Sequence, residues 1–232
     1  MSEYYPYPEL IPEEVVERAK RYGAAELADG MKGLGILNDG CMEASILPID
    51  ENTKLIGTAV TVETGDGDNF PIHVALYQGK PGYVLVIDGK GYKEKGYLGD
   101  LIGGAAKAVG LEGIVIDGYV RDRIGLKEMQ LPVYSKGFMQ RGPSKVGPGK
   151  INTPILCGGV HVNPGDLVVG DGDGITIVPR DRIEEVFAAA EKKTVYEEKR
   201  RETIAKYEEC VKKGEEPPEL APQWVLDMLK KE

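Results

Sequence analysis

Two short apolar runs of similar composition lie near the middle of the chain. The first, at residues 83–89, and the second, at 113–118, both end in Val-Ile-Asp-Gly. Continuous β-branched runs of this length predict buried parallel strands. Between them, residues 101–109 are rich in Ala, Leu and Ile, and Gly110 stands where a helix should end. The pattern therefore predicts a βαβ unit with a right-handed crossover.

The flanking patterns predict a mixture of helices and strands around this unit. Pro12 and two acidic residues open a helix that Gly23 closes, and a long charged helix is expected from an Asp181 cap to Lys213, before Gly214. The other expected elements are helices at 24–31 and, after an Asn69 cap, at 70–78; strands near 56–64, 131–135, 151–156, 160–162, 167–170 and 174–178; and an amphipathic segment around Trp224.

The same patterns indicate how the chain divides. Residues 1–214 are expected to form a single α/β domain with a mixed sheet and a long C-terminal helix. A run of two glutamates and two prolines at 215–218 follows that helix and separates it from the tail. Because the tail at 215–232 has too little apolar surface for a core of its own, we expect it to pack on the body or on a neighbouring subunit.

Composition mainly excludes classes of protein. The chain has 232 residues, 41% of them hydrophobic, and a net charge of −9, which argues against a nucleic-acid partner. No apolar run approaches the ~20 residues that span a bilayer, and residues 1–6 lack a secretion-signal pattern. We therefore expect no membrane partner and a cytoplasmic protein. The three cysteines are widely spaced, which fits a reducing compartment and indicates no zinc site.

The predicted βαβ unit brings two polar clusters to one edge of the sheet. At the helix start, Gly99, Asp100, Leu101 and Ile102 should present unpaired backbone N–H groups to an anion. Just past the second strand lie Arg121 and Asp122. Arginine offers a planar fork for a carboxylate, and aspartate offers a hard oxygen ligand for Mg²⁺ or Mn²⁺. Twenty residues separate Asp100 from Arg121, giving the pattern D-x20-R-D.

Each candidate residue has a structural alternative. Asp100 alone could be a helix-capping acid, and Arg121 beside Asp122 could be an exposed turn pair. The acidic stretches at 66–68 and 171–174 resemble cation loops but lack a third ligand and a closing glutamate, so turn chemistry is favoured. His73 and His161 are the only histidines, and we interpret both as structural.

The D-x20-R-D pattern, with its flanking Gly-Asp-Leu and Val-Ile-Asp-Gly-Tyr-Val-Arg-Asp, resembles the RraA-like family. The resemblance covers roughly residues 25–205, and its further motifs lie at 65–69, 81–83, 162–166 and 175–179. It implies a three-layered β/β/α swivelling-type domain with helical N-terminal and C-terminal extensions, assembled as a homotrimer or homohexamer. The family includes metal-dependent 4-hydroxy-4-methyl-2-oxoglutarate aldolases, but also regulators of ribonuclease activity, so the resemblance alone does not decide the chemistry.

The expected activity is that of a divalent-metal-dependent lyase acting on a short 2-oxo acid. It would release pyruvate by aldol cleavage, decarboxylate an oxaloacetate-like substrate, or both, through a pyruvate enolate. Asp122 would hold Mg²⁺, Mn²⁺ or another divalent metal, and Arg121 would pair with the substrate oxygens. The amides at 99–102 would take the carboxylate, and Asp100 would hold a water that acts as acid or base. The competing interpretation is a regulator that binds a ribonuclease or another protein without chemistry of its own.

The resemblance also implies a residue from a neighbouring subunit. In the similar aldolases, a glutamate of the neighbour's C-terminal region reaches the metal's water shell. This chain has Glu197, Glu198 and Glu202 in the corresponding helix, and Glu202 is favoured. The alternative is an ordinary solvated glutamate, because basic residues lie beside it.

Overall fold

The predicted βαβ unit forms the centre of the fold. The computed structural model describes residues 2–230. In it, β4 (Tyr83–Asp88), α4 (Asp100–Ala108) and β5 (Gly113–Ile116) follow one another, and the two strands pair in parallel. β3 (Leu55–Thr64) and β7 (Val133–Ser135) add parallel strands on either side. The first five residues of β4 are all buried, which explains why its apolar run is continuous rather than alternating.

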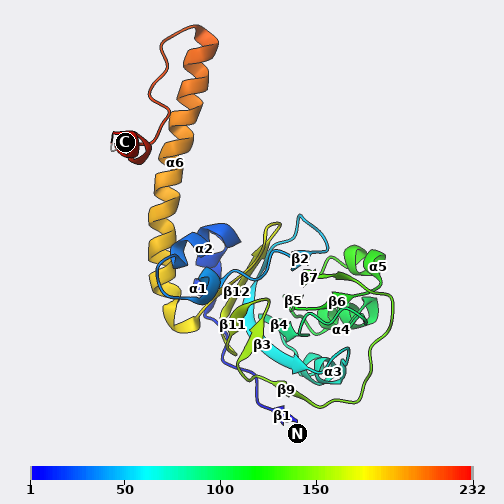
Figure 1. The fold of residues 1–232 in the computed structure, drawn as a ribbon. Helices are drawn as coiled ribbons and strands as arrows, with labels where there is room; N and C mark the ends of the chain where they lie inside the picture. The colour runs from blue at the N-terminus through cyan, green and yellow to red at the C-terminus, as the bar shows by residue number, and fades with distance from the viewer. Residues whose placement is uncertain (1, 231–232) are drawn as a thin grey trace. The chain divides into compact units, whose positions relative to one another are not determined.

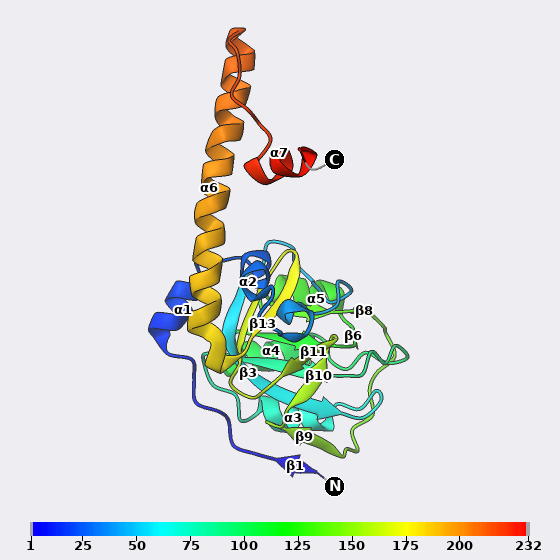
Figure 2. The same ribbon diagram turned by 60° about the vertical axis from the view of Figure 1, so that its left-hand side comes forward.

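The sheet branches at β3, which has ten residues and therefore room for two partners along one edge. Its first half pairs with β12 and its last three residues pair with β9, both antiparallel. Within residues 2–230 the order is β1-β9-β3-β4-β5-β7-β2, with β13 joined through β12 (Figures 1 and 2). The added strands are β1 (Glu3–Tyr4), β2 (Leu47–Pro48), β9 (Gly149–Ile151), β12 (Leu167–Asp171) and β13 (Gly174–Val178).

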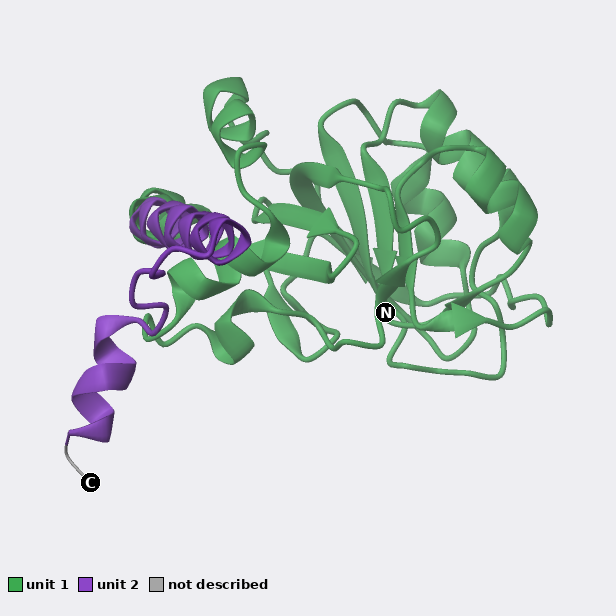
Figure 3. Ribbon diagram, turned by 90° about the horizontal axis from the view of Figure 1, so that it is seen from above, with its two compact units in different colours: residues 1–190 green, residues 191–232 purple. Residues whose placement is uncertain are grey.

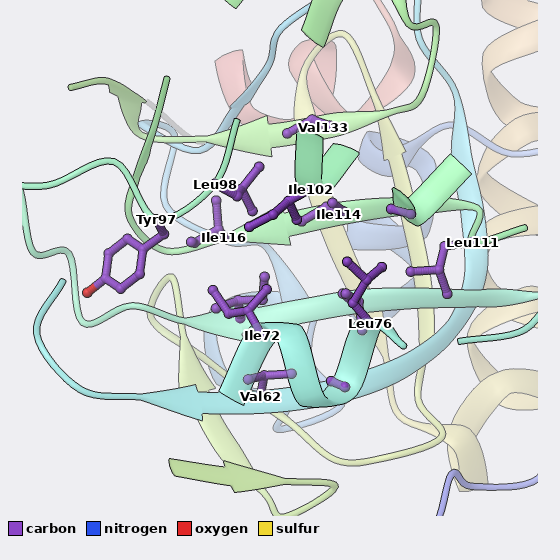
Figure 4. Close-up of a cluster of buried hydrophobic side chains, with 14 of the residues drawn as sticks. Val62, Ile72, Leu76, Tyr97, Leu98, Ile102, Leu111, Ile114, Ile116 and Val133 are labelled. Carbon is purple, nitrogen blue, oxygen red and sulfur yellow. The ribbon is translucent and has the colours of Figure 1, made fainter. Parts of the chain in front are cut away.

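Two apolar clusters on opposite faces of the parallel strands give the domain three layers. On one face α3 (Phe70–Leu76) and α4 cover the sheet, and Figure 4 shows Ile72, Leu76 and Ile102 packed against strand residues such as Ile114. On the other face, strand residues pack against β10–β13. β10 (Ile155–Cys157) and β11 (Val160–Val162) form an antiparallel pair of their own. The fold is thus the α/β, three-layered β/β/α arrangement that the resemblance implied.

A third cluster joins the helical extensions to the far side of β12 and β13. It contains residues of α1 (Glu13–Ala19), α2 (Ala24–Met31) and the first turns of α6 (Ile183–Lys213). By contacts the chain divides into two units, residues 1–190 and 191–232, coloured separately in Figure 3. The second unit holds the rest of α6, and α7 (Gln223–Leu229). The expected packing of the tail at 215–232 stays a prediction.

Several local expectations need correction. Asp181 lies inside a 3-10 turn (Arg180–Arg182) before α6 and is not the cap of that helix. The strand expected at 151–156 is split between β9 and β10, because Asn152 has a left-handed backbone with φ 58°. Asn69 does hold the N-cap position of α3, but its side chain makes no capping bond there. Among residues 2–230, no helix has both the length and the apolar character that a membrane crossing requires.

Several short elements were not anticipated, and those nearest the candidate residues are α5 (Arg123–Glu128), β6 (Tyr119–Val120) and β8 (Gly137–Phe138). Each is six residues or shorter, too short for a hydrophobic period to develop. They nevertheless determine the surroundings of the candidate residues, because Asp122 is the N-cap residue of α5.

Candidate functional site

The helix start and the strand end that the sequence brings together do lie around one cavity of about 100 Å³. Its lining combines residues 97–102, which lead into the first turn of α4, with Arg121 and Asp122, which follow β6. The backbone N–H of Arg121 donates to the carbonyl of Leu98 at 2.9 Å, so the two segments are joined directly. The other lining residues are Asn69, His73, Pro143 and Lys145.

The start of α4 offers unpaired backbone donors to this cavity. Gly99 is the N-cap, and the first bond of the helix runs from Gly103 N–H to the Gly99 carbonyl at 2.9 Å. The N–H groups of Asp100, Leu101 and Ile102 have no acceptor within the described part of the chain. Together with the positive end of the helix dipole, these donors favour an anion such as a carboxylate.

Asp122 presents a carboxylate that the fold does not use. It occupies the N-cap of α5 in a left-handed conformation, φ 55° and ψ 46°, but its side chain makes no capping hydrogen bond. It pairs instead with the neighbouring guanidinium, with Arg121 Nε 3.3 Å from Asp122 Oδ2, and the Asp122 side chain is 38% exposed. An acidic group at an N-cap would ordinarily bond the helix N–H groups. Apart from this ion pair, the Asp122 carboxylate has no partner among residues 2–230 and is available to another ligand.

Two glycines allow the acidic groups to approach the backbone. A Cβ atom at Gly99 would collide with Oδ2 of Asp122, so this carboxylate lies directly against the start of α4. A Cβ atom at Gly125 would lie 2.9 Å from the Cβ of Asp100. The side chain of Asp100 is exposed and makes no hydrogen bond or ion pair with residues 2–230, so the structure does not use it as a cap either.

The donor set suits a hard divalent cation with few protein ligands. Within residues 2–230, no group of three or more His, Cys, Asp or Glu side chains is arranged to hold a metal ion. The cavity instead offers the Asp122 carboxylate, with the Asp100 carboxylate on the same lining. Mg²⁺ commonly binds through one or two carboxylates and keeps several waters. The residues therefore fit Mg²⁺ better than a metal that needs a closed cage.

The cavity also contains residues that the sequence pattern did not place in the site: Asn69 was expected as a helix cap and His73 as a structural residue. Asn69 and His73 are four residues apart and share one face of α3, a spacing that could have been noticed. Burial and, to a smaller extent, the charge of Lys145 lower the pKa of His73 below its ordinary value and so favour the neutral imidazole. Lys145 itself lies in an irregular segment, and no sequence pattern indicated its place.

The proposed glutamates lie on α6 in the second unit. Glu197 forms an ion pair with Arg201 at 2.9 Å, one helical turn away. Glu198 and Glu202 are exposed and make no ion pair with any described residue. The contribution of Glu202 to a neighbouring site stays a prediction.

A larger cavity of about 900 Å³ lies elsewhere, and we do not favour it as the reaction site. Its lining includes Lys54, Gly82 and Glu112, which immediately precede β3, β4 and β5. It therefore lies at the amino ends of the parallel strands. Ligands of α/β sheets bind outside the carboxyl ends of the strands, where the smaller cavity is found.

Comparisons with known proteins identify relatives of this chain. Residues 24–177 match the RraA-like family model, described as Aldolase/RraA. A Halalkalibacterium halodurans protein with the provisional name 4-hydroxy-4-methyl-2-oxoglutarate aldolase is 39% identical over 179 residues, covering 77% of this chain and 83% of the relative. An uncharacterized protein from Pseudomonas syringae pv. tomato superposes with a TM-score of 0.74 at 28% identity, covering 87% of this chain and 93% of that one. Streptomyces coelicolor RraAS2, described as an unusual member of the RNase ES inhibitor RraA protein family, gives 0.72 at 28% identity, covering 82% and 98%.

Proposed function

This chain belongs to the RraA-like family, and we propose that it is a divalent-metal-dependent lyase that releases pyruvate from a short 2-oxo acid. The substrate would resemble 4-hydroxy-4-methyl-2-oxoglutarate in an aldol cleavage, or oxaloacetate in a decarboxylation. One observation carries the proposal. The Asp122 carboxylate, unused by the fold, shares a small cavity with the Arg121 guanidinium and the unpaired N–H groups of α4.

Some residues of the cavity would bind the substrate, and others would stabilise the charge that develops during the reaction. The N–H groups at the start of α4 would hold the carboxylate next to the 2-oxo group. Breaking the bond between C3 and C4 sends its electron pair toward the 2-oxo oxygen, which gives an enolate. Arg121 would stabilise that negative charge. In the aldol reaction the C4 hydroxyl must lose a proton and C3 must gain one, and Asp100 would position a water for these transfers.

Asp122 would hold the metal, with Mg²⁺ preferred and Mn²⁺ or another divalent cation as alternatives. When bound, the cation supplies Lewis-acid stabilisation of the enolate. Arg121 Nε pairs with Oδ2 of Asp122, so Oδ1 of the same carboxylate would be the oxygen that holds the cation.

An assay of pyruvate release tests the function. The purified protein is incubated with 4-hydroxy-4-methyl-2-oxoglutarate and with oxaloacetate, untreated, with EDTA, and with EDTA followed by excess Mg²⁺. Activity lost with EDTA and regained with Mg²⁺ supports the proposal. Absence of metal-dependent pyruvate release from both substrates would leave the protein-binding regulator as the better interpretation, and that interpretation accounts for the Streptomyces relative.

Exposed apolar side chains around the cavity support self-association. Leu101, Ile124 and Val146 are 82%, 75% and 81% exposed, and each lies in the cavity lining or within two residues of it. The cavity is also far below the ~300–1,000 Å³ of ordinary small-molecule sites. A neighbouring subunit would cover these apolar side chains and supply the missing wall. We therefore propose a homotrimer or homohexamer whose sites each lie between two chains.

A mixing experiment tests whether Glu202 completes a neighbour's site. Asp122→Asn chains and Glu202→Gln chains, each inactive alone, are combined and allowed to exchange subunits. Mixed oligomers should regain activity, because some sites then receive an intact Asp122 from one chain and an intact Glu202 from the other. Mass spectrometry confirms the mixing. Glu198→Gln serves as the matched control and should be active on its own; mixed oligomers without regained activity would exclude Glu202.

The close approach of Gly99 to Asp122 gives a second test. Gly99→Ala should weaken Mn²⁺ binding and pyruvate release at least tenfold, because the new Cβ displaces the Asp122 carboxylate. Gly104→Ala is the control: it lies in the same helix, a Cβ atom there would have no neighbour within 4 Å, and the change should stabilise α4 by about 0.5–1 kcal/mol. Calorimetric titration with Mn²⁺ measures the first effect, and equal affinities for the two variants would show that Asp122 is not displaced.

A further inference from the structure

A buried aspartate outside the D-x20-R-D pattern ties a distant segment to the cavity. Asp68 is only 4% exposed. Its Oδ2 accepts a hydrogen bond from Val146 N–H at 2.7 Å, and its Oδ1 accepts from Gly147 N–H at 3.1 Å and Phe70 N–H at 3.0 Å. These backbone bonds together outweigh burial, which alone would raise the pKa, and they keep the pKa of Asp68 below its ordinary value. Asp68 is therefore an ionised carboxylate, and both of its oxygens accept hydrogen bonds from backbone N–H groups.

Backbone hydrogen bonds reinforce the same connection. Ser144 N–H donates to the Gly67 carbonyl at 2.8 Å, and Asn69 N–H donates to the Ser144 carbonyl at 3.0 Å. Asp68 and Ser144 form an isolated parallel bridge. The Ser144 hydroxyl also donates to the Gly67 carbonyl at 3.1 Å. The turn at 65–69 and the segment at 144–147 are thus joined by five hydrogen bonds, and the Asp68 carboxylate accepts the two from Val146 and Gly147.

The segment held in this way contributes to the candidate site. Pro143 and Lys145 line the cavity, and a Cβ atom at Gly142 would lie 3.1 Å from a terminal guanidinium nitrogen of Arg121. Lys145 makes no ion pair with residues 2–230, so its own side chain does not hold it there. The neighbouring residue, Val146, is 81% exposed, so packing within residues 2–230 does not fix the segment.

We propose that Asp68 is a positioning residue that fixes the 144–147 segment so that the Lys145 ammonium faces the cavity. The hydrogen bonds hold the backbone on both sides of Lys145, and Lys145 is part of the cavity lining. Its consequence rests on the proposed function: the ammonium would attract the anionic substrate into the site. This assigns a role to an acidic turn that the sequence pattern otherwise leaves as turn chemistry.

Aspartate is required for this role because both of its oxygens accept. In Asp68→Asn the side-chain amide keeps one acceptor, its carbonyl oxygen. Its NH₂ group is a donor and would face a backbone N–H, which is also a donor, so no hydrogen bond can form between them. If the asparagine carbonyl oxygen accepts from Phe70 N–H and Gly147 N–H, its NH₂ group faces Val146 N–H, and the hydrogen bond to Val146 is lost. We expect the segment to detach on the side that carries Lys145.

The titration of His73 reports the position of Lys145 without any activity measurement. The protein is labelled with ¹³C-histidine, carries His161→Gln so that one histidine is observed, and is kept metal-free with EDTA. In Asp68→Asn the pKa of His73 should rise, because Lys145, which lowers it, moves away. Direct loss of the Asp68 charge would have the opposite effect, since removing a nearby negative charge lowers a histidine pKa. Asp100, Arg121 and Asp122, the other charged groups lining the cavity, are unchanged in every variant.

A double-mutant cycle separates this movement from simple exposure of His73. If Asp68 acts through Lys145, then Asp68→Asn should change the pKa of His73 much less in a Lys145→Met background. A rise of the same size in both backgrounds would overturn the proposal, and so would an unchanged pKa in the folded single variant. Asp66→Asn, in the same turn but exposed, is the charge-matched control and should leave His73 unaffected. If Asp68→Asn does not fold, Asp68→Ser, which is smaller and retains one acceptor, is measured in its place.

Kinetics provide the second readout. In the metal-loaded protein, Asp68→Asn should lower kcat/KM for the pyruvate-forming substrate about tenfold, the scale of one charge-assisted contact. Most of the loss should be in KM, and it should largely disappear in the Lys145→Met background. If the protein releases no pyruvate with any substrate, the proposed function fails, while the histidine titration still decides the role of Asp68. A kcat/KM loss of equal size in both backgrounds would contradict the action through Lys145.

Discussion

Asp122→Asn should abolish metal-dependent pyruvate release while the protein stays folded. The expected loss is several kcal/mol of transition-state stabilisation, on the order of a thousandfold or more in kcat, because the neutral amide is a poor ligand for Mg²⁺. The fold should tolerate the change for two reasons. The Asp122 side chain makes no capping bond, and asparagine adopts the left-handed conformation at φ 55° as readily as aspartate does.

The measurement pairs kinetics with metal binding and thermal unfolding. Asp122→Asn should lose both pyruvate release and tight Mn²⁺ binding, with a melting temperature close to that of the wild type. Asp122→Ala is the comparison, since alanine in a left-handed conformation costs about 1–2 kcal/mol. It should be equally inactive but less stable. If purified Asp122→Asn retained wild-type activity sensitive to EDTA, the assignment of the metal to Asp122 would be wrong.

The centre of the fold and the meeting of the two polar clusters followed from sequence because they depend on local patterns and one topological rule. Continuous apolar runs predicted the parallel strands, and Gly110 marked the end of α4, where it has φ 84°. A βαβ unit places the start of its helix and the end of its second strand at one edge. That rule brought residues 99–102 and Arg121 to the same cavity, as the structure shows. Their catalytic roles stay predictions.

The residues that the sequence did not reveal depend on contacts between distant segments. Val146 is 78 residues from the Asp68 carboxylate that holds it, and the segment around it has no hydrophobic period to analyse. Lys145 therefore had no readable signature. Asp122 was placed in a polar turn because α5 has only six residues, too few to be distinguished from a turn. The left-handed backbone that frees its carboxylate is a tertiary feature, and it could not be predicted from composition.

The fold alone does not choose between catalysis and protein binding, because relatives of both descriptions share it. Catalysis is favoured in this chain because several polar groups of the cavity do not stabilise a helix end and, apart from the pair of Asp122 with Arg121, do not bond to another described residue. The Asp122 carboxylate makes no cap, the Asp100 carboxylate has no partner within residues 2–230, and the first N–H groups of α4 have no acceptor there. A surface that only binds another protein has no need to converge such groups on one cavity of about 100 Å³.

Arg121→Lys should remove most of the catalytic activity of the protein, although the positive charge is kept. The Arg121 guanidinium extends between two places: its Nε lies 3.3 Å from Asp122 Oδ2, and a terminal nitrogen lies beside Gly142, where a Cβ atom would approach to 3.1 Å. A lysine ammonium is a single compact group and cannot occupy both. We expect a loss of about 2–4 kcal/mol in transition-state stabilisation, mainly in kcat, because the enolate charge develops only as the bond breaks.

Arg123→Lys is the matched control, because Arg123 is two residues away but serves a different contact. Its guanidinium lies 4.9 Å from the centre of the Phe138 ring and does not line the candidate cavity. Exchange of this arginine should leave kcat within about twofold of the wild type and reduce stability by about 0.5–1 kcal/mol at most. Steady-state kinetics with both 2-oxo acids compares the variants. Equal losses at the two positions would mean that general positive charge matters more than the fork of Arg121, and full activity in Arg121→Lys would remove Arg121 from the mechanism.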